Sequence, residues 1–378
     1  MGFESQGYFE FGIGQYFCKE SNLRMISKGY LLAVLVTLLV FIRLLFSTPP
    51  FSFDYFAYLT IIHGLGGLTF HEILVQKLNF PYVVTGLFTP IEFGFSLFVK
   101  LISAFGFNPE TALSLIAALS VGLRVFVMYK LRVPMLWIVC INVFAITLLE
   151  ANALRLGLAS SVLLFGLLQW SRQRRIAAIT LMGLSVTIHL QVMLFLAPFF
   201  LAKLFLKWIS LSRFNRMVAL FGLLIISLSA FELLNLVDIP KIQEYIARGG
   251  SESAGISITS ILALFLIVCT VILIKGNDKI YTDSSMFQLV IFACTPSVFA
   301  LIFLTNVAVI GDRAWQLAFL IFSSFIFTNW SSRKSKRIVL FIFIMLLSVM
   351  QINVLIRYPL SNFFSPPFPS IEYYKGPD

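Results

Sequence analysis

Six ionisable residues stand out in an otherwise apolar chain, because neither a basic loop nor a soluble surface accounts for them. They are Asp54, Glu92, Arg155, His189, Arg248 and Arg313. Charged groups at membrane depth are costly, so they usually pair, face a cavity or take part in function. A guanidinium binds phosphate oxygens in bidentate fashion, and a carboxylate or an imidazole can take up a proton. These residue types therefore suit a site that binds an anion and moves a proton.

The three arginines also have structural interpretations. Arg155 and Arg313 open apolar segments and can extend along the membrane interface with their charges in water. Glu150 is expected to form a salt bridge with Arg155. Arg248 ends an amphipathic helix in which Glu244 is a pairing partner, although its place beside two glycines also makes it a candidate phosphate contact. Arg155 and Arg313 are both expected at the outer ends of spans, whereas basic residues of membrane proteins usually face the cytoplasm. This departure favours a functional role for both.

The other three residues have similar alternatives. Asp54 precedes Tyr58 in an aromatic segment and suits a helix cap at the membrane interface. Glu92 follows Pro90 and suits the first turn of a helix, where a negative charge is stabilised. His189 ends an apolar segment and can cap a helix or bond a backbone carbonyl. Sequence alone leaves both interpretations of each residue open.

The composition predicts an all-α, polytopic integral membrane protein. Of its 378 residues, 59% are hydrophobic and only 12% are charged, and the mean hydropathy is +0.94. A soluble domain carries about 25% charged residues. Long apolar segments satisfy their backbone polar groups within a membrane by forming helices.

Eleven segments are expected to cross the membrane. They cover residues 29–46, 109–128, 133–149, 155–170, 176–190, 192–206, 217–235, 257–274, 286–305, 314–330 and 338–356. The segment 82–107 is also apolar, but a crossing there would place the basic loops "SRQRR" and "SRKSKR" outside. Because basic loops face the cytoplasm, we expect 82–107 to be a re-entrant or surface helix on the outer face.

This topology organises the whole chain, 1–378, as one membrane domain. Residues 1–28 are expected in the cytoplasm. A large outer loop with surface helices covers 47–108, a second outer loop covers 236–256, and the tail 357–378 also lies outside.

Several ligand classes are not expected. The net charge is +11, but no segment combines clustered basic residues with a soluble fold, so nucleic acid is not an expected partner. The four cysteines are scattered, and His63 and His71 have only Glu72 nearby. Neither set has the spacing of metal ligands, so no metal and no cofactor is expected.

The order of five short motifs resembles a known family. "DYFAY" follows the first span, and "EFGFSLFVKLISAFG", "RLGLASSVLLFGLL", "RQRR" and "IHL" come after it in that order. This series resembles the EpsG/Wzy-like family of bacterial polysaccharide polymerases over residues 30–205. In the rest of the chain only Arg313 carries the resemblance. Two motifs depart from the family pattern: "EFGF" lacks the proline that often follows the glutamate, and "RLGLA" lacks the glutamine that often follows the arginine.

The resemblance implies an enzyme of the bacterial cytoplasmic (inner) membrane. Its architecture is similar to that of the C class of membrane glycosyltransferases, known as GT-C. The implied reaction joins undecaprenyl-diphosphate-linked repeat units into O-antigen, capsule or exopolysaccharide at the outer face. The implied partners are this lipid-linked glycan, the lipid bilayer, and the chain-length regulator and flippase of the same pathway.

The resemblance also suggests roles for the six residues. Arg155 and Arg313, and then Arg248, are candidates for binding the diphosphate leaving group. Asp54 and Glu92 are candidates for the base that accepts the acceptor hydroxyl's proton, with His189 as the next choice.

Three other functions remain open at this stage, and one of them is a structural scaffold in an export complex. A glycosyltransferase of the same fold would add single sugars from a polyprenyl-phosphate donor. A transporter or flippase for lipid-linked sugars would carry polar residues along a path at mid-membrane depth. The unexplained charges gather at the outer face, which disfavours transport, although Arg43 and Arg124 are explained only as residues that extend to the interface.

Overall fold

The computed structural model describes a little over two fifths of the chain. The described residues are 34–39, 55–75, 79–82, 87–146, 149, 153–193, 195–197, 199–200, 218, 222, 225, 293–294 and 308–325. Among the predicted site residues, Asp54 and Arg248 lie outside them. The tails 1–28 and 357–378 and the loop 236–256 also lie outside them. So does all or most of each predicted span other than 109–128, 133–149, 155–170, 176–190 and 314–330.

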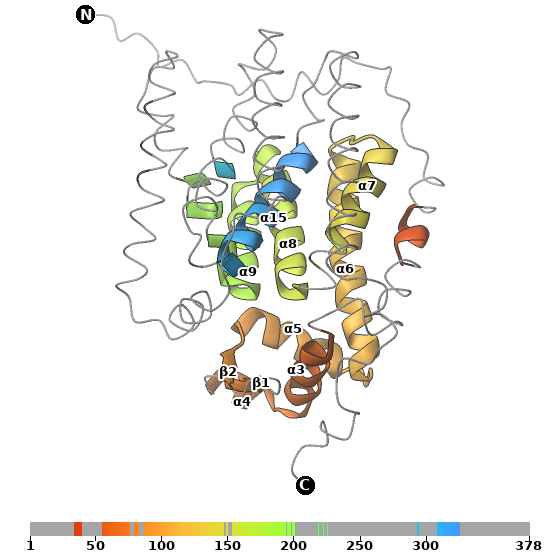
Figure 1. Cartoon of the computed structure of the whole chain (residues 1–378), viewed down its shortest axis with the longest axis vertical. Coiled ribbons are helices and arrows are strands. Elements are labelled where there is room, and N and C mark those ends of the chain that lie inside the picture. The colour runs from red at the N-terminus through yellow and green to blue at the C-terminus, as the bar shows by residue number, and fades with distance from the viewer. Residues whose placement is uncertain are drawn as a thin grey trace, which may run out of the picture.

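Five helices form the bundle shown in Figure 1. They are α6 (Pro109–Lys130), α7 (Met135–Ala145), α8 (Leu154–Ser171), α9 (Arg175–Ile188) and α15 (Ala308–Phe325). Helix α8 packs against α6 and α9, and α15 packs against α7 and α8. The first four helices overlap predicted spans. Helix α15 begins six residues before the predicted span 314–330, and its apolar part is Gln316–Phe325.

Helices α6 and α8 are long and apolar enough to cross a membrane, judged by length and composition alone. Helix α8 is the centre of the described bundle. Its 18 residues span about 27 Å, and nearly all of its side chains are buried. Small residues let its neighbours approach closely, as where the Ser161 hydroxyl lies 3.0 Å from that of Ser120 on α6.

Helices α6 and α8 end in turns of the same kind. Arg132 and Gln173 adopt the left-handed conformation, with φ of 57° and 61°. The N–H of Val133 then donates to the Met128 carbonyl at 3.0 Å, and the N–H of Arg174 to that of Gln169 at 3.0 Å. Each is a Schellman turn, which lets the chain reverse within a few residues.

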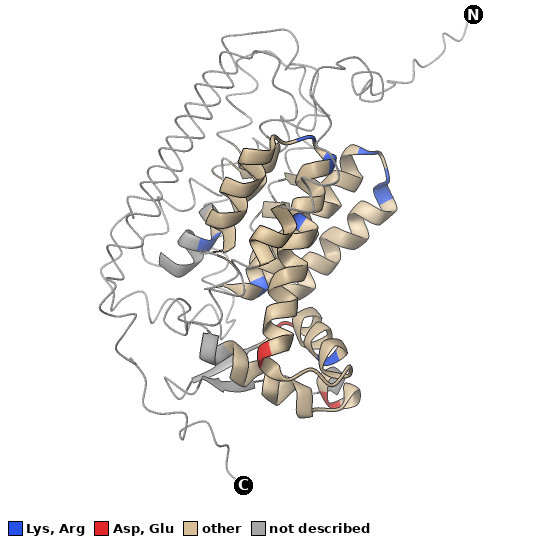
Figure 2. Cartoon of the chain, turned by 90° about the vertical axis from the view of Figure 1, so that its right-hand side faces the viewer, with Lys and Arg blue, Asp and Glu red and all other residues tan. Residues whose placement is uncertain are grey.

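Charge is distributed unevenly between the two ends of the bundle. The turns after α6 and α8 carry Lys130, Arg132, Arg172, Arg174 and Arg175. In Figure 2 several Lys and Arg segments gather at the end of the bundle away from α3–α5, and the acidic segments lie toward the α3–α5 end. The charge pattern predicts that these basic turns face the cytoplasm, and that orientation stays a prediction.

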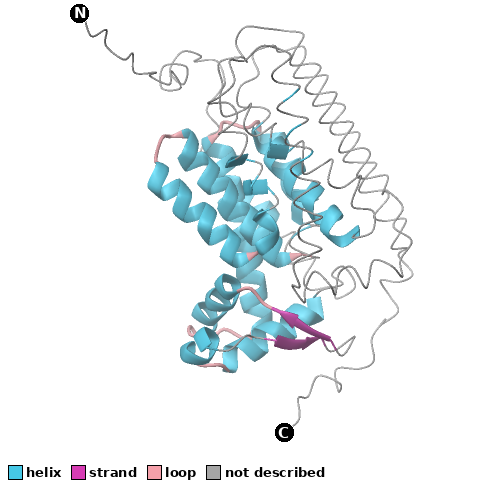
Figure 3. Cartoon of the chain, turned by 90° about the vertical axis from the view of Figure 1, so that its left-hand side faces the viewer, coloured by secondary structure: helices cyan, strands magenta, loops and turns pink. Residues whose placement is uncertain are grey.

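The segment before the bundle holds three helices and a hairpin. Helices α3 (Tyr55–Gly67) and α4 (Phe70–Val75) are followed by strands β1 (Asn79–Tyr82) and β2 (Leu87–Pro90), and then by α5 (Phe93–Ser103). The strands are antiparallel, with Asn79 opposite Pro90 and Tyr82 opposite Leu87. Figure 3 shows this hairpin at the same end of the molecule as α3–α5.

The hairpin corrects one prediction. Apart from this pair of four-residue strands the described chain is helical, as the all-α class predicts. Of the segment predicted as one helix over 82–107, the described residues are helical from Phe93 to Ser103 and are strand residues at Tyr82 and Leu87–Pro90. Pro81 and Pro90 explain the difference, because proline removes a helical hydrogen bond and clashes with the preceding turn.

Thr69 and Glu72 start helix α4 with a capping box. The Thr69 N–H donates to Glu72 Oε2 at 2.6 Å, the Thr69 hydroxyl donates to the same oxygen at 2.8 Å, and the Glu72 N–H donates to the Thr69 hydroxyl at 3.2 Å. The backbone hydrogen bond and then the hydroxyl bond from Thr69 lower the pKa of Glu72 below its usual value. The carboxylate beside His71 therefore has a local structural role.

Helix α5 is held against both α3 and α9. The Lys100 ammonium donates to the Gly66 carbonyl at the end of α3, at 2.8 Å. At the start of α5, Gly94 packs directly on α9. A Cβ on Gly94 would lie 2.7 Å from the carbonyl carbon of Thr187 and 2.8 Å from its oxygen. No side chain larger than hydrogen fits at this contact.

The Gly94 contact predicts that Gly94→Ala is destabilising. The added methyl meets backbone that cannot rotate away, and overpacking of this kind typically costs about 1–3 kcal/mol. Thermal unfolding of the purified protein in detergent measures the effect. Gly183→Ala on α9 is the matched control, because a Cβ there meets nothing within 4 Å. Equal melting temperatures for both variants would contradict the close contact.

Candidate functional site

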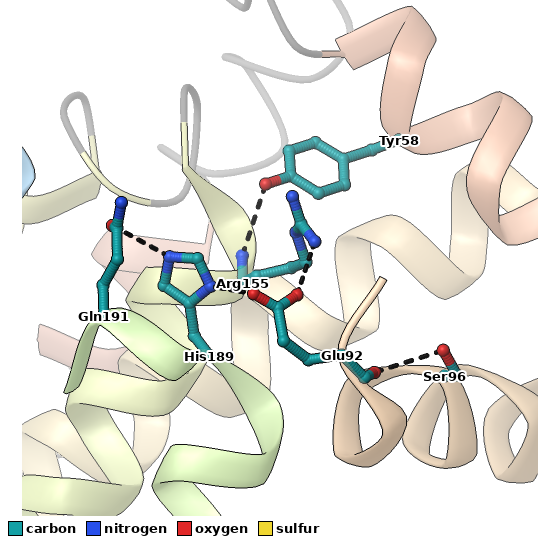
Figure 4. A network of polar contacts seen from close by, with 6 residues as sticks. All are labelled: Tyr58, Glu92, Ser96, Arg155, His189 and Gln191. Atoms are coloured by element: carbon teal, nitrogen blue, oxygen red, sulfur yellow. Dashed lines mark hydrogen bonds and ion pairs between the residues drawn. The ribbon is translucent and has the colours of Figure 1, made fainter. Parts of the chain in front are cut away.

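Three elements bring three of the predicted residues together at the hairpin end of the bundle. Glu92 lies just before α5, Arg155 in the first turn of α8, and His189 directly after α9. Glu92 is 63 residues from Arg155 and 97 residues from His189 in the sequence. Figure 4 shows their side chains converging on the Glu92 carboxylate.

The Glu92 carboxylate is shared between two partners. Its Oε2 lies 2.5 Å from Arg155 Nη1, and its Oε1 lies 2.8 Å from His189 Nδ1. Each carboxylate oxygen therefore faces a different nitrogen-bearing group. Such an arrangement orients both the guanidinium and the imidazole ring.

All three side chains are shielded from solvent. The exposed fractions are 11% for Glu92, 9% for Arg155 and 2% for His189. Removing one member of a buried ion pair leaves an uncompensated charge, which typically costs about 3–5 kcal/mol. Glu92 and Arg155 therefore depend on each other, and Arg155 does not extend into water as a snorkelling arginine would.

The local backbone turns Glu92 toward its partners. Glu92 is the N-cap residue of α5, yet its side chain makes no capping hydrogen bond. Its carbonyl instead accepts from the Ser96 N–H at 3.1 Å and from the Ser96 hydroxyl at 3.2 Å. The carboxylate is thus free of a capping role, and the alternative interpretation of Glu92 as a first-turn residue is insufficient.

The "DYFAY" motif also reaches this site. Its last residue, Tyr58 on α3, is buried and packs edge-on against Phe95, with ring centroids 6.3 Å apart. The Arg155 N–H donates to the Tyr58 hydroxyl at 3.5 Å. The motif therefore contributes a contact at the start of α8, whereas Asp54 itself lies outside the described residues.

Gln191 is a member of the network that the sequence did not single out. It lies in the short 3-10 helix η3 (Leu190–Val192), and its Oε1 is 3.1 Å from His189 Nε2. The only signal available in the sequence was its position two residues after the histidine in "IHLQ".

Arg313 lies near the same imidazole. It is partly exposed on α15, which packs against α8 and η3, and the charges of both Arg155 and Arg313 act on His189. Because α15 begins at Ala308, Arg313 lies in its second turn and does not open the helix.

Glu92 is a partner of Arg155 that the sequence did not suggest. The predicted partner Glu150 lies outside the described residues, so that pairing stays a prediction. One interpretation from the sequence does need correction. Arg124 was explained as an arginine that extends to the interface, but it is fully buried. Its Nε donates to Asn142 Oδ1 on α7 at 2.8 Å, and the Asn142 amide donates in turn to the Ile138 carbonyl at 2.8 Å. Arg124 therefore lies inside the bundle.

The ion pair predicts strong energetic coupling between Glu92 and Arg155. In a double-mutant cycle with Glu92→Gln and Arg155→Met, we expect a coupling energy of about 1–3 kcal/mol in the free energy of unfolding. Denaturant unfolding in detergent provides the four values. A cycle of Arg155→Met with Glu110→Gln, at an exposed position on α6, should show no coupling. Additive effects for Glu92 and Arg155 would contradict the ion pair.

Comparison with models of protein families finds a match to the EpsG family over residues 30–366. The match covers most of the chain and confirms the resemblance that the motifs indicate. Comparison with curated proteins and with solved structures finds no match.

Proposed function

The chain belongs to the EpsG family, and from that premise we propose that it polymerises lipid-linked oligosaccharide repeat units of a bacterial polysaccharide. The family is associated with polysaccharide biosynthesis in membranes and implies a lipid-linked glycan substrate. In our proposal this substrate is carried on undecaprenyl diphosphate, and the product is O-antigen, capsule or exopolysaccharide.

One observation carries the proposal: a single carboxylate orients an imidazole and forms an ion pair with a buried arginine. Glu92 contacts both His189 and Arg155, and the charge of Arg313 also acts on His189. With a neutral imidazole, Glu92, Arg155 and Arg313 together carry a net positive charge. A proton acceptor beside this positive charge suits transfer of a glycan from a diphosphate.

The proposed transfer uses His189 as the base. An oxygen of the acceptor sugar attacks the anomeric carbon of the donor glycan and forms the new C–O bond. The bond between that carbon and the diphosphate oxygen breaks, and the diphosphate leaves with the electron pair. The hydroxyl proton passes to Nε2 of His189, while Glu92 orients the ring through Nδ1.

The arginines are proposed to stabilise the leaving diphosphate. A guanidinium has five N–H donors, so Arg155 can bind a phosphate oxygen while one nitrogen contacts Glu92. Arg313 is partly exposed and approaches from a different helix. Two cations on separate helices allow the diphosphate to be held between them. Arg248 remains a further proposed contact.

The charge distribution supports an outward-facing site. Figure 2 shows Lys and Arg gathered at the end of the bundle away from α3–α5, and Glu92 directly precedes α5. By the positive-inside rule, the basic end faces the cytoplasm. We propose a multi-pass protein of the inner membrane with eleven spans, a cytoplasmic N-terminus and an outer C-terminus.

Arg155→Ala and Arg313→Ala are expected to abolish the polymer while the protein remains inserted in the membrane. The loss follows from the missing positive charge at the leaving group. Gel analysis of surface polysaccharide from cells that carry each variant measures chain length, with immunoblotting of membranes for insertion. Arg172→Ala, exposed at the basic end, should keep normal chain length. Normal chain length in both Arg155→Ala and Arg313→Ala would refute the diphosphate role.

His189→Ala and Glu92→Gln test the base. Loss of a general base typically lowers a rate by about 10²–10⁴-fold, so we expect His189→Ala to lose the polymer and Glu92→Gln to be strongly impaired. Asp54→Asn is the competing test, since Asp54 was also a candidate from sequence. The base assignment moves to Asp54 if Asp54→Asn is inactive and His189→Ala retains activity.

Purified protein supplied with lipid-linked repeat units from the producing cells tests the function as a whole. A polymerase yields a ladder of glycan lengths. A glycosyltransferase that uses polyprenyl-phosphate sugars would add single sugars only from that donor. A flippase would move the lipid-linked units across a vesicle membrane without joining them.

A further inference from the structure

Both ring nitrogens of His189 face a side-chain oxygen. Nδ1 lies 2.8 Å from Glu92 Oε1, and Nε2 lies 3.1 Å from Gln191 Oε1 (Figure 4). The imidazole is almost fully buried, whereas Gln191 is only partly buried. The ring is therefore held at one end by a carboxylate and at the other by an amide on the more exposed side.

The carboxylate fixes one of the two ring protons. Glu92 forms an ion pair with Arg155 and is therefore ionised, and an ionised carboxylate only accepts hydrogen bonds. Nδ1 must then carry a hydrogen. This leaves Nε2 as the nitrogen that gains or loses a proton.

An amide is suited to either state of Nε2. With Oε1 toward the ring, Gln191 accepts a hydrogen bond from Nε2–H of the imidazolium. After a half-turn of the amide, its NH₂ group donates to the bare Nε2 of the neutral ring. A carboxylate at this position could only accept, and an apolar side chain could do neither.

We propose that Gln191 is a positioning residue that holds Nε2 of His189 in both protonation states. Its catalytic use rests on the proposed function, in which His189 is the base. The amide orients the neutral ring until the acceptor hydroxyl replaces it at Nε2. When the lone pair of Nε2 has formed the new N–H bond, Gln191 Oε1 can stabilise the imidazolium.

The other charged groups around the ring come from three elements. Glu92 precedes α5, Arg155 is on α8 and Arg313 is on α15. Glu92 favours a positive ring, and the two arginines oppose it. The Gln191 amide is uncharged and can hydrogen-bond to either protonation state of the ring. It therefore adds no further fixed charge around His189.

Nitrogen-15 NMR of the histidine ring tests the contact directly. The chain has three histidines, and His63 and His71 are exposed, so His63→Gln with His71→Gln leaves His189 as the only imidazole. The full-length protein with these two changes, labelled at histidine and placed in lipid nanodiscs, is the parent. Gln191→Met and Gln191→Glu are then introduced separately. Gln169→Met, at the far end of α8, is the matched control.

The two variants should shift the nitrogen-15 signal of Nε2 in opposite directions. In Gln191→Met, Nδ1 keeps its proton, and the Nε2 signal shifts to that of an imine nitrogen without a hydrogen bond. In Gln191→Glu, both nitrogens show the signals of a protonated imidazolium. Gln169→Met should match the parent. Identical Nε2 signals in the parent and both Gln191 variants would overturn the proposal.

Polysaccharide chain length separates this proposal from the proposed function. A base that is held protonated cannot accept a proton, so Gln191→Glu should make at least about tenfold less polymer than Gln191→Met. If the NMR shifts occur and Gln191→Glu still polymerises normally, the positioning contact stands and the role of His189 as base is refuted.

Discussion

The Glu92 carboxylate, shared between Arg155 and His189, is the contact on which the described site depends. All three side chains are shielded from solvent, and a buried guanidinium without its carboxylate would be strongly unfavourable. The contact therefore requires α5, α8 and α9 to meet at one end of the bundle. The same carboxylate fixes the proton of His189 Nδ1 and leaves Nε2 for chemistry or for Gln191.

Close backbone packing makes this meeting possible. Gly94 allows the start of α5 to lie directly on Thr187, two residues before His189. The contact between Lys100 and Gly66 holds α5 to α3, and Tyr58 on α3 reaches the start of α8. A glycine in "EFGF" is thus needed for shape, while the glutamate two residues earlier supplies the charge.

Several elements were predictable because their signals are local. The long apolar segments that became α6, α8 and α9 need no tertiary contact to be recognised, since their length and composition already require a helix in a membrane. The hairpin was missed because the segment 79–90 is apolar too, and apolarity alone does not separate a strand from a buried helix. The contact between Arg155 and Glu92 was missed because the two residues are 63 positions apart in the sequence and are near only in space.

The sequence alone determined that this is a membrane protein of the EpsG family, and it singled out Glu92, Arg155, His189 and Arg313 as unexplained charges. Those inferences follow from composition, motif order and the cost of charge beside apolar segments. Only the tertiary structure decided that Glu92 bridges Arg155 and His189, that Gln191 faces Nε2, and that Arg124 is buried against Asn142. Hydrogen bonds and ion pairs depend on distances of a few ångströms between residues such as Glu92 and His189, which are 97 positions apart in the sequence. Helix packing sets those distances.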